Sequence, residues 1–398
     1  MRSAFNNLVE TRTQKKRTRR SGKSSPDSGT GAAHGGAHVG SAIGSGILNT
    51  STSNRMEAFA LLGYLGPREH AVPSLGLTRC GLRNTGNTCY LNALLFCFAK
   101  LRHLRSWLQQ HMDLTATEAG HNRNCILCLF AQDMTVLTRE PVNRPFVPAI
   151  VRARGLWNAA FANNDQQDAH EAFTSILESC DTVDRRKVQE LAGDVLEAAN
   201  NIDFSATFAW KCFGRNELVS FRCLQCGKHR ETMDSLNCLQ LPLPGEGPFT
   251  LESLLDRYEA EEALLDDDDV CKDVDENTGH DSGCGGTRCQ TRKLTISTLP
   301  EILVIQFRRF QFEASTLRFA KINDHVRFGP TLQRGADRAF TLKGVLVHSG
   351  SLHVGHYTAY VRDDDANWFF CDDANAPQFV SDTDRVFAQQ AYMLFYEQ

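Results

Sequence analysis

The stretch Gly81-Leu82-Arg83-Asn84-Thr85-Gly86-Asn87-Thr88-Cys89-Tyr90-Leu91-Asn92 places a cysteine directly after a run of turn-forming residues. Apolar residues then recur at helical spacings of three and four: Leu91, Leu94, Leu95, Phe98, Leu101, Leu104 and Leu108. Cys89 is therefore predicted in the first helical turn, where free backbone N–H groups and the helix dipole favour a thiolate. The same N–H groups, together with the Asn84 amide, could stabilise an oxyanion. A cysteine at a helix start is weak evidence alone, because free cysteine is usually buried.

The composition excludes several classes of protein. The chain has 398 residues, 41% of them hydrophobic, and a net charge of -4, which does not indicate a membrane or nucleic-acid partner for the whole molecule. Its polar, basic start is not a signal peptide, and no stretch approaches the ~18 apolar residues of a membrane span. We therefore expect an intracellular protein, cytoplasmic or nuclear, whose 14 cysteines are catalytic, metal-binding or buried rather than disulfide-bonded.

The chain divides into two regions. Residues 1–75 are predicted to form a disordered, basic, Ser/Gly-rich arm and linker. Their basic cluster at 15–20 is either a nuclear-import or polyanion-binding patch or a solvated tail. Residues 77–398 are predicted to form the folded domain, with helices at 168–180, 185–199 and 251–265. Strands are predicted after Lys293, at 294–296, 302–307, 340–348, 356–362, 368–371 and 392–396. Helices followed by a mostly antiparallel sheet indicate an α+β fold.

A nucleophilic cysteine needs a base, which can lie far away in the sequence. The stretch 346–360 contains three histidines. His356 follows a glycine and opens a strand-like run, whereas His348 ends the preceding strand and His353 lies in the turn between them. A carboxylate that orients the imidazole follows on the next strand, at Asp372 or Asp373. The residues alone leave that choice open.

These segments resemble the motifs of the ubiquitin-specific proteases, which are papain-like cysteine proteases. Residues 81–92 meet every specified position of the cysteine box, and 355–360 match Gly-His-Tyr-x-Ala-Tyr of the histidine box. The resemblance implies that residues 77–398 are the catalytic domain of a ubiquitin-specific protease, and that catalysis needs no cofactor. It also implies the role of each residue: Cys89 as nucleophile, Asn84 as oxyanion donor, His356 as general base, Asp372 as orienting carboxylate and Asp373 as a residue that assists in stabilising the oxyanion. We expect the Cys89 sulfur within hydrogen-bonding reach of His356, with its pKa depressed by an ion pair.

A third box, Gln166-Gln167-Asp168-Ala169-His170-Glu171, resembles the family's Gln-Gln-Asp-Ala-His-Glu motif, with Ala172 where an aromatic residue is usual. Asp168 and Glu171 would share a helix face and could pair with arginines of an extended peptide. The resemblance implies that Gln166, Asp168 and Glu171 bind the ubiquitin tail. It also implies a thiol-dependent deubiquitinase that hydrolyses the (iso)peptide bond after the C-terminal glycine of ubiquitin. Its partners would be ubiquitin and ubiquitinated proteins, with no membrane and no nucleic acid beyond the basic arm.

The implied papain-like fold has a helical thumb, an antiparallel-sheet palm and zinc-ribbon-like fingers. Cys223-x-x-Cys226-Gly227 forms half of a zinc ribbon. The second half departs from the family, because Cys284 and Cys289 are two residues further apart than in Cys-x-x-Cys, and Cys271 could replace either one. We predict Cys223, Cys226, Cys284 and Cys289 as ligands of a structural zinc, while a ribbon without metal stays open. Another pair, Cys125-x-x-Cys128, is more typical of a buried core helix.

Three alternatives remain for the function. A catalytically silent ubiquitin-binding module is disfavoured because cysteine, histidine and aspartate are all present. A zinc- and nucleic-acid-binding protein would leave the three boxes unexplained. An isopeptidase for another ubiquitin-like modifier is chemically equivalent, and only a panel of modifier probes separates it from a deubiquitinase.

Overall fold

The computed structural model describes residues 80–115, 125–139, 144–192, 207–245, 247–266, 269–272, 282–313, 318–351 and 354–398. These residues belong to the second of two units of the chain, Pro67–Gln398. The predicted arm at 1–75, with its basic cluster, and His353 lie outside the described residues, so the division at residues 75 and 77 stays a prediction. No helix in the described part of the chain has the length and apolar character that a membrane crossing requires.

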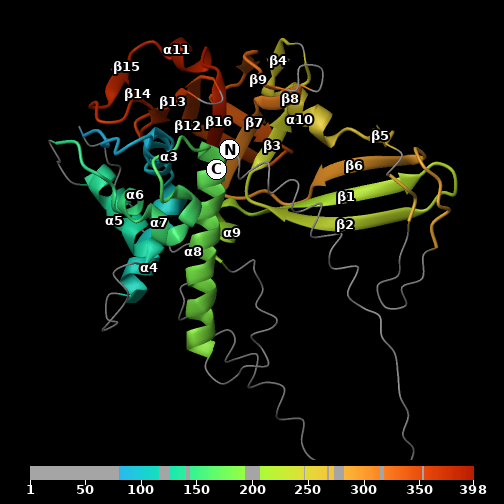
Figure 1. Cartoon of the computed structure of the whole chain (residues 1–398), viewed down its shortest axis with the longest axis horizontal. Coiled ribbons are helices and arrows are strands. Elements are labelled where there is room, and N and C mark those ends of the chain that lie inside the picture. The colour runs from blue at the N-terminus through green and yellow to red at the C-terminus, as the bar shows by residue number, and fades with distance from the viewer. Residues whose placement is uncertain are drawn as a thin grey trace, which may run out of the picture. The chain divides into compact units, whose positions relative to one another are not determined.

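An eight-stranded sheet organises the described part of this unit (Figure 1). Its order is β15-β14-β13-β12-β16-β7-β3, with β11 paired to β12, and all pairs are antiparallel except β3 with β7. The strands are β3 (Leu239–Pro242), β7 (Ile302–Arg308), β11 (Thr331–Arg334), β12 (Arg338–Gly350), β13 (Gly355–Arg362), β14 (Trp368–Cys371), β15 (Gln378–Val380) and β16 (Ala391–Glu397). Every strand predicted from 302 onward corresponds to one of these.

The sheet separates two hydrophobic cores because successive side chains of a strand point to opposite faces. In β12, Leu346 belongs to one core, while Val345 and Val347 belong to the other. Strand β16 alternates in the same way, with Met393 on the first side and Leu394 on the second. Both faces of the central strands are therefore covered, which explains why these segments are almost continuously apolar.

The helices gather mainly in the first half of the unit (Figure 1). They are α3 (Cys89–Phe98), α4 (Arg102–Thr115), α5 (Ile126–Arg139), α6 (Ala149–Arg152), α7 (Arg154–Trp157), the 3-10 helix η1 (Ala159–Phe161), α8 (Ala169–Ala192), α9 (Phe208–Phe213), α10 (Leu251–Glu259) and α11 (Asp384–Phe387). Helix α3 lies between the sheet, which it contacts at β12 and β13, and the helices α5 and α8. All ten of its residues are buried, so this helix is the centre of the first core.

Three sequence-based helix boundaries were wrong. The periodic run from Thr88 is two helices, because tight i+3 bonds from Lys100 and Leu101 close α3 before α4 begins. The two helices predicted at 168–180 and 185–199 are one helix, α8, up to residue 192. No Gly or Pro interrupts it, and the Thr182 hydroxyl donates to the Glu178 carbonyl within the helix. Helix α10 ends at Glu259, before Ala260 turns to an extended conformation.

A second sheet projects from the first as a long ribbon (Figure 1). Its order is β2-β1-β6-β5, formed by β1 (Arg215–Cys223), β2 (His229–Leu236), β5 (Glu262–Leu264) and β6 (Gln290–Ile296). All side chains of β2 are exposed. Two short pairs complete the strands described: β4 (Phe249–Thr250) with β10 (Val326–Arg327), and β8 (Phe310–Glu313) with β9 (Arg318–Lys321). The ribbon corresponds to the predicted fingers.

The contact of α3 with β12 depends on a missing side chain at Gly344. A Cβ atom there would lie 2.9 Å from the Cys97 sulfur and 3.1 Å from the Cys97 Cβ. We expect Gly344→Ala to lower the free energy of unfolding by about 1–3 kcal/mol through overpacking. Urea denaturation should show that adding Cys97→Ala, which removes the sulfur, recovers part of this loss. Gly245→Ala, with open space around the new Cβ, is the control. Equal stability of the Gly344 and Gly245 variants would contradict the prediction.

Candidate active site

Cys89 is the first residue of α3, and its side chain is buried. Thr88 offers no side-chain cap to the helix, and the backbone groups of Cys89, Tyr90 and Tyr357 hydrogen bond to the sulfur. Burial nevertheless raises the pKa of the Cys89 thiol, and the charge of Asp373 raises it further against those hydrogen bonds. The predicted depression of this pKa is therefore wrong for the described structure, in which Cys89 is a neutral thiol.

His356 and Asp372 form a close pair. His356 lies near the start of β13, Asp372 follows β14, and Nε2 of the ring is 2.7 Å from Oδ1 of the carboxylate. The Asn375 amide donates to the other oxygen of Asp372 at 3.2 Å. Among the described residues, no direct hydrogen bond joins the Cys89 sulfur to the His356 ring, so the hydrogen bond that the sequence led us to expect is not formed in this structure. The sulfur instead meets the backbone of Tyr357, the residue after His356.

His348 is placed differently from His356. Its side chain is buried, and its ring centre lies 4.6 Å from that of Tyr357. Burial lowers the pKa of His348 to about 4, helped by the positive charge of Lys321. His348 is therefore neutral at physiological pH and packs as an aromatic ring beside the strand that carries His356.

Asp373 connects the two halves of the site. Its carboxylate accepts hydrogen bonds from the amides of Asn84 and Asn92, both at 2.8 Å, and its carbonyl accepts the Leu82 N–H at 2.6 Å. Its φ of 44° is left-handed, a conformation that aspartate tolerates better than most residues. The motifs did not identify Asn92 as a site residue, although a polar side chain within an apolar helix was a usable signal.

Asn84 is held rigidly in the turn before α3. Its Oδ1 accepts from the backbone N–H groups of Gly86 and Thr88, at 3.1 and 3.0 Å. Its Nδ2 donates to Asp373, and because an amide nitrogen carries two hydrogens, one donor remains. This arrangement orients the amide beside the first turn of α3.

The residues of the third box contact the protein itself. The Gln166 amide both donates to the Gly355 carbonyl at 3.2 Å and accepts the Gly355 N–H at 3.0 Å. Asp168 accepts the N–H groups of His170 and Glu171 at the start of α8, and its other oxygen accepts the hydroxyls of Tyr392 and Tyr357. Gln166 thus positions the backbone before His356. Glu171 lies half-buried in the first turn of α8.

Cysteines converge at the end of the ribbon. Sulfur atoms of Cys223, Cys226, Cys271 and Cys284 all lie within 4.8 Å of one another. Cys289 is also near, with its sulfur 3.4 Å from that of Cys223. The four mutually close sulfurs therefore include Cys271, with Cys289 as a fifth neighbour, whereas the predicted set had Cys289 and not Cys271. Cys271 lies in this cluster because its backbone hydrogen bonds to the backbone of Gly285 and Gly286.

The cluster fits a tetrahedral zinc ion. Zinc–sulfur bonds of about 2.3 Å place neighbouring sulfurs about 3.8 Å apart. The Cys223–Cys284 and Cys226–Cys271 sulfur pairs are 3.7 and 3.8 Å apart. The Cys226 N–H also points at the Cys223 sulfur, at 3.5 Å. A Cβ at Gly286 would lie 3.0 and 3.3 Å from the sulfurs of Cys289 and Cys284, so this glycine gives the sulfurs room.

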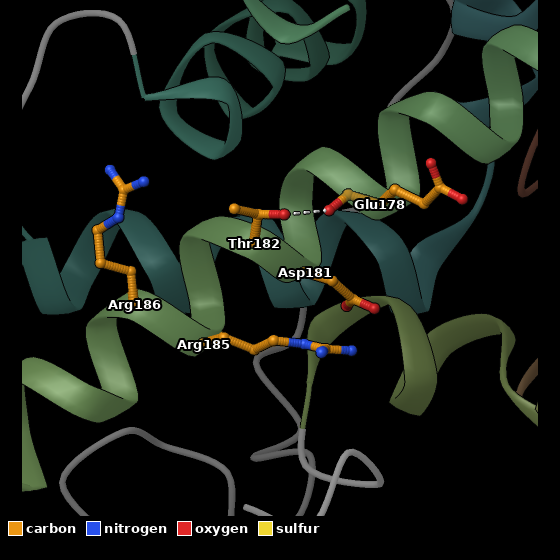
Figure 2. Close-up of a pocket in the computed structure, with 5 residues that line it drawn as sticks. All are labelled: Glu178, Asp181, Thr182, Arg185 and Arg186. Carbon is orange, nitrogen blue, oxygen red and sulfur yellow. Dashed lines mark hydrogen bonds between the residues drawn. The ribbon is translucent and has the colours of Figure 1, made fainter. Parts of the chain in front are cut away.

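A charged cavity of about 430 Å³ lies along α8 (Figure 2). Its lining residues are Glu178, Asp181, Thr182, Arg185 and Arg186. The Asp181 carboxylate accepts the Ala209 N–H at 3.3 Å and so ties α8 to α9. The lining of the cavity contains no cysteine and no histidine, and it includes none of the residues proposed for the reaction.

The raised pKa of Cys89 has a consequence for its reactivity. Only the thiolate is alkylated, so its reaction with iodoacetamide should increase with pH. Half of the maximal rate should be reached above the ~8.5 of an ordinary thiol. Peptide mass spectrometry of the free protein across a pH series measures this for Cys89 alone. A midpoint below neutrality would show instead that a thiolate–imidazolium pair already exists without substrate.

The sequence of this chain is similar to those of known proteins. The family model described as ubiquitin carboxyl-terminal hydrolase matches residues 80–396. Ubiquitin carboxyl-terminal hydrolase Usp2 of Drosophila melanogaster is 28% identical over 346 residues, which cover 80% of this chain and 34% of that protein. Ubiquitin carboxyl-terminal hydrolase 25 of Arabidopsis thaliana is 27% identical over 336 residues, with 79% and 47% covered. The chain spans about a third to a half of the length of these relatives.

Solved structures share the fold. The Ubp8/Sgf11/Sus1/Sgf73 DUB module of SAGA bound to ubiquitin aldehyde contains a chain with a TM-score of 0.60 and 21% identity, covering 80% of this chain and 69% of that one. A yeast SAGA DUB module with an Sgf73 mutant gives a TM-score of 0.65 at 21% identity, covering 86% and 74%. The predicted α+β, papain-like fold with helical, sheet and finger regions is confirmed. Because the family model covers most of the sequence and both cores, this chain belongs to the ubiquitin carboxyl-terminal hydrolase family.

Proposed function

We propose that this protein is a thiol-dependent deubiquitinase that hydrolyses the (iso)peptide bond after the C-terminal glycine of ubiquitin. The family supports the reaction class, and one observation carries the assignment. His356, paired with Asp372 at 2.7 Å, stands one residue from the backbone group that contacts the Cys89 sulfur. Cysteine, imidazole and carboxylate in this order are the parts of a nucleophilic triad.

The first step is proton transfer from the Cys89 thiol to His356. Since burial keeps the thiol neutral, His356 acts as a general base while the sulfur attacks the glycine carbonyl. Asp372 holds the ring and stabilises the imidazolium that forms. The imidazolium then gives its proton to the leaving lysine amine. Water, activated by the neutral ring, finally hydrolyses the thioester and frees the ubiquitin carboxylate.

The oxyanion of each tetrahedral intermediate needs preorganised donors. We assign this role to the N–H groups at the start of α3 and to the remaining N–H of the Asn84 amide, which lies in the turn before that helix. Asp373 accepts a 2.8 Å hydrogen bond from that amide, so it positions the Asn84 side chain that would bind the oxyanion. Its negative charge also raises the Cys89 pKa, which means that Asp373 contributes geometry and not thiol activation.

The third box has two assignments. Gln166 holds the Gly355 backbone and thereby His356. Glu171 offers a carboxylate for an arginine of the ubiquitin tail. Asp168 would be a second partner of the tail, in addition to the hydrogen bonds that its two oxygens accept within the protein. The finger cysteines would hold a zinc ion as a structural ligand set, outside the reaction. We propose ubiquitin and ubiquitinated proteins as partners, no membrane, nucleic acid only at the basic arm, and a cytoplasmic or nuclear location.

The test is covalent capture by a ubiquitin C-terminal electrophile. The full chain should gain the mass of one ubiquitin probe, and Cys89→Ala should gain none because the nucleophile is absent. Intact-mass spectrometry measures both, and hydrolysis of ubiquitin-aminomethylcoumarin should disappear in the same variant. Cys97→Ala, a buried cysteine of the same helix, is the matched control and should keep both signals. Labelling of Cys89→Ala would refute the assignment of Cys89 as nucleophile. Labelling only by probes of another ubiquitin-like modifier would show that the substrate is that modifier and not ubiquitin.

Asn84→Ala separates binding from catalysis. Loss of one oxyanion donor typically lowers kcat by about 10²–10³, equivalent to ~2.7–4 kcal/mol. We expect this loss in kcat with a small change in KM, because the amide acts on the intermediate rather than on bound ubiquitin. Steady-state kinetics on ubiquitin-aminomethylcoumarin measure both parameters. A change confined to KM would show that Asn84 binds substrate instead.

A further inference from the structure

A second group of metal-ligating side chains lies in the helical lobe, apart from the finger cysteines. His111 belongs to α4, Cys125 directly precedes α5, and Cys128 lies in the first turn of α5. Helices α4 and α5 pack against each other (Figure 1). The three ligand atoms all lie within 4.8 Å of one another. Two elements of the fold therefore bring one imidazole and two thiols to the same point.

The distances are those of ligands around one ion. Nε2 of His111 is 3.5 Å from the Cys125 sulfur and 3.4 Å from the Cys128 sulfur. With zinc–nitrogen bonds of about 2.0–2.1 Å and zinc–sulfur bonds of about 2.3 Å, tetrahedral geometry separates nitrogen and sulfur by about 3.5 Å. Both measured distances agree with this value, and one imidazole nitrogen faces two sulfurs at once.

The local structure also suits a cation with two thiolates. Cys125 and Cys128 are three residues apart at a helix start, so their side chains share one face. The N-terminal end of a helix stabilises the negative charge of thiolates. Two thiolates would neutralise a divalent ion, so no net charge would remain in this partly buried place. Cys125 is buried, while Cys128 and His111 are half-buried, which leaves a route for the ion.

We propose that His111, Cys125 and Cys128 bind a zinc ion that joins α4 to α5. The described residues supply three ligands, and a fourth donor completes the tetrahedral coordination. None of the residues proposed for the reaction belongs to this group, so we assign the ion a structural role, in which it holds the two helices together. This inference is independent of the ubiquitin reaction, because it concerns metal content and the stability of the helical lobe.

The test begins with the unmodified full chain, purified with zinc in the growth medium and freed of loosely bound metal. Mass spectrometry of metals should find about two zinc ions per chain, one in the fingers and one here. Zinc X-ray absorption should show imidazole nitrogen in addition to sulfur. About one zinc per chain with a shell of sulfur alone would overturn the proposal, because a hydrogen-bonded cluster without metal would then explain the short distances.

Variants assign the second ion to these residues. The triple variant His111→Ala/Cys125→Ser/Cys128→Ser should lose about one zinc ion and retain a shell of sulfur only. Cys223→Ser/Cys226→Ser should also lose about one, and its remaining zinc should keep the nitrogen ligand. Cys180→Ala, a fully buried cysteine of α8, is the control with unchanged zinc. Unchanged zinc in the triple variant overturns the site. If that variant does not fold, the nitrogen ligand in the finger variant decides the question.

Discussion

The carboxylate of Asp373 is the contact on which the geometry of the site depends. It lies in the turn after β14 and accepts one amide from the loop before α3 and another from inside α3, each at 2.8 Å. Its neighbour Asp372 holds His356 at 2.7 Å. Two adjacent carboxylates therefore fix the histidine strand and the cysteine helix relative to each other, through charge-assisted hydrogen bonds that are stronger than neutral ones.

This arrangement separates positioning from activation. The charge that orients Asn84 also disfavours a thiolate at Cys89, and burial acts in the same direction. The proposed nucleophile is thus kept neutral in the free protein, and in the proposed reaction the imidazole of His356 takes its proton. A neutral thiol is also protected from oxidation and alkylation, which target the thiolate.

The surrounding fold keeps these contacts rigid. Helix α3 is buried on every side between the sheet and the helices, and Gly344 allows its close approach to β12. Just before α8, Gln166 hydrogen bonds to the backbone of Gly355. Asp168 accepts the hydroxyls of Tyr357 and Tyr392. The cysteine clusters at the ribbon end and between α4 and α5 lie outside this centre.

The sequence by itself determined many of the helices and strands and indicated the residues of the proposed reaction. Periodic patterns located α3 and five strands from 302 onward (β7, β12, β13, β14 and β16), because the face to which a side chain points depends on its near neighbours in the chain. Strands β11 and β15 of the same sheet were not predicted. The motif residues identified the cysteine and the histidine of the proposed triad. The sequence did not determine where helices begin and end. It predicted two helices where the structure has the single helix α8, because packing overrides weak local preferences there.

Only the tertiary structure decided which groups meet. The choice of Asp372 over Asp373 as the partner of His356 depends on one residue of turn geometry. The bonds of Gln166 to Gly355 join residues 189 positions apart, and Cys271 enters the sulfur cluster through backbone pairing with Gly286. His111 reaches two cysteines because α4 packs on α5. Such contacts depend on the summed packing of distant segments, which no local pattern of residues records.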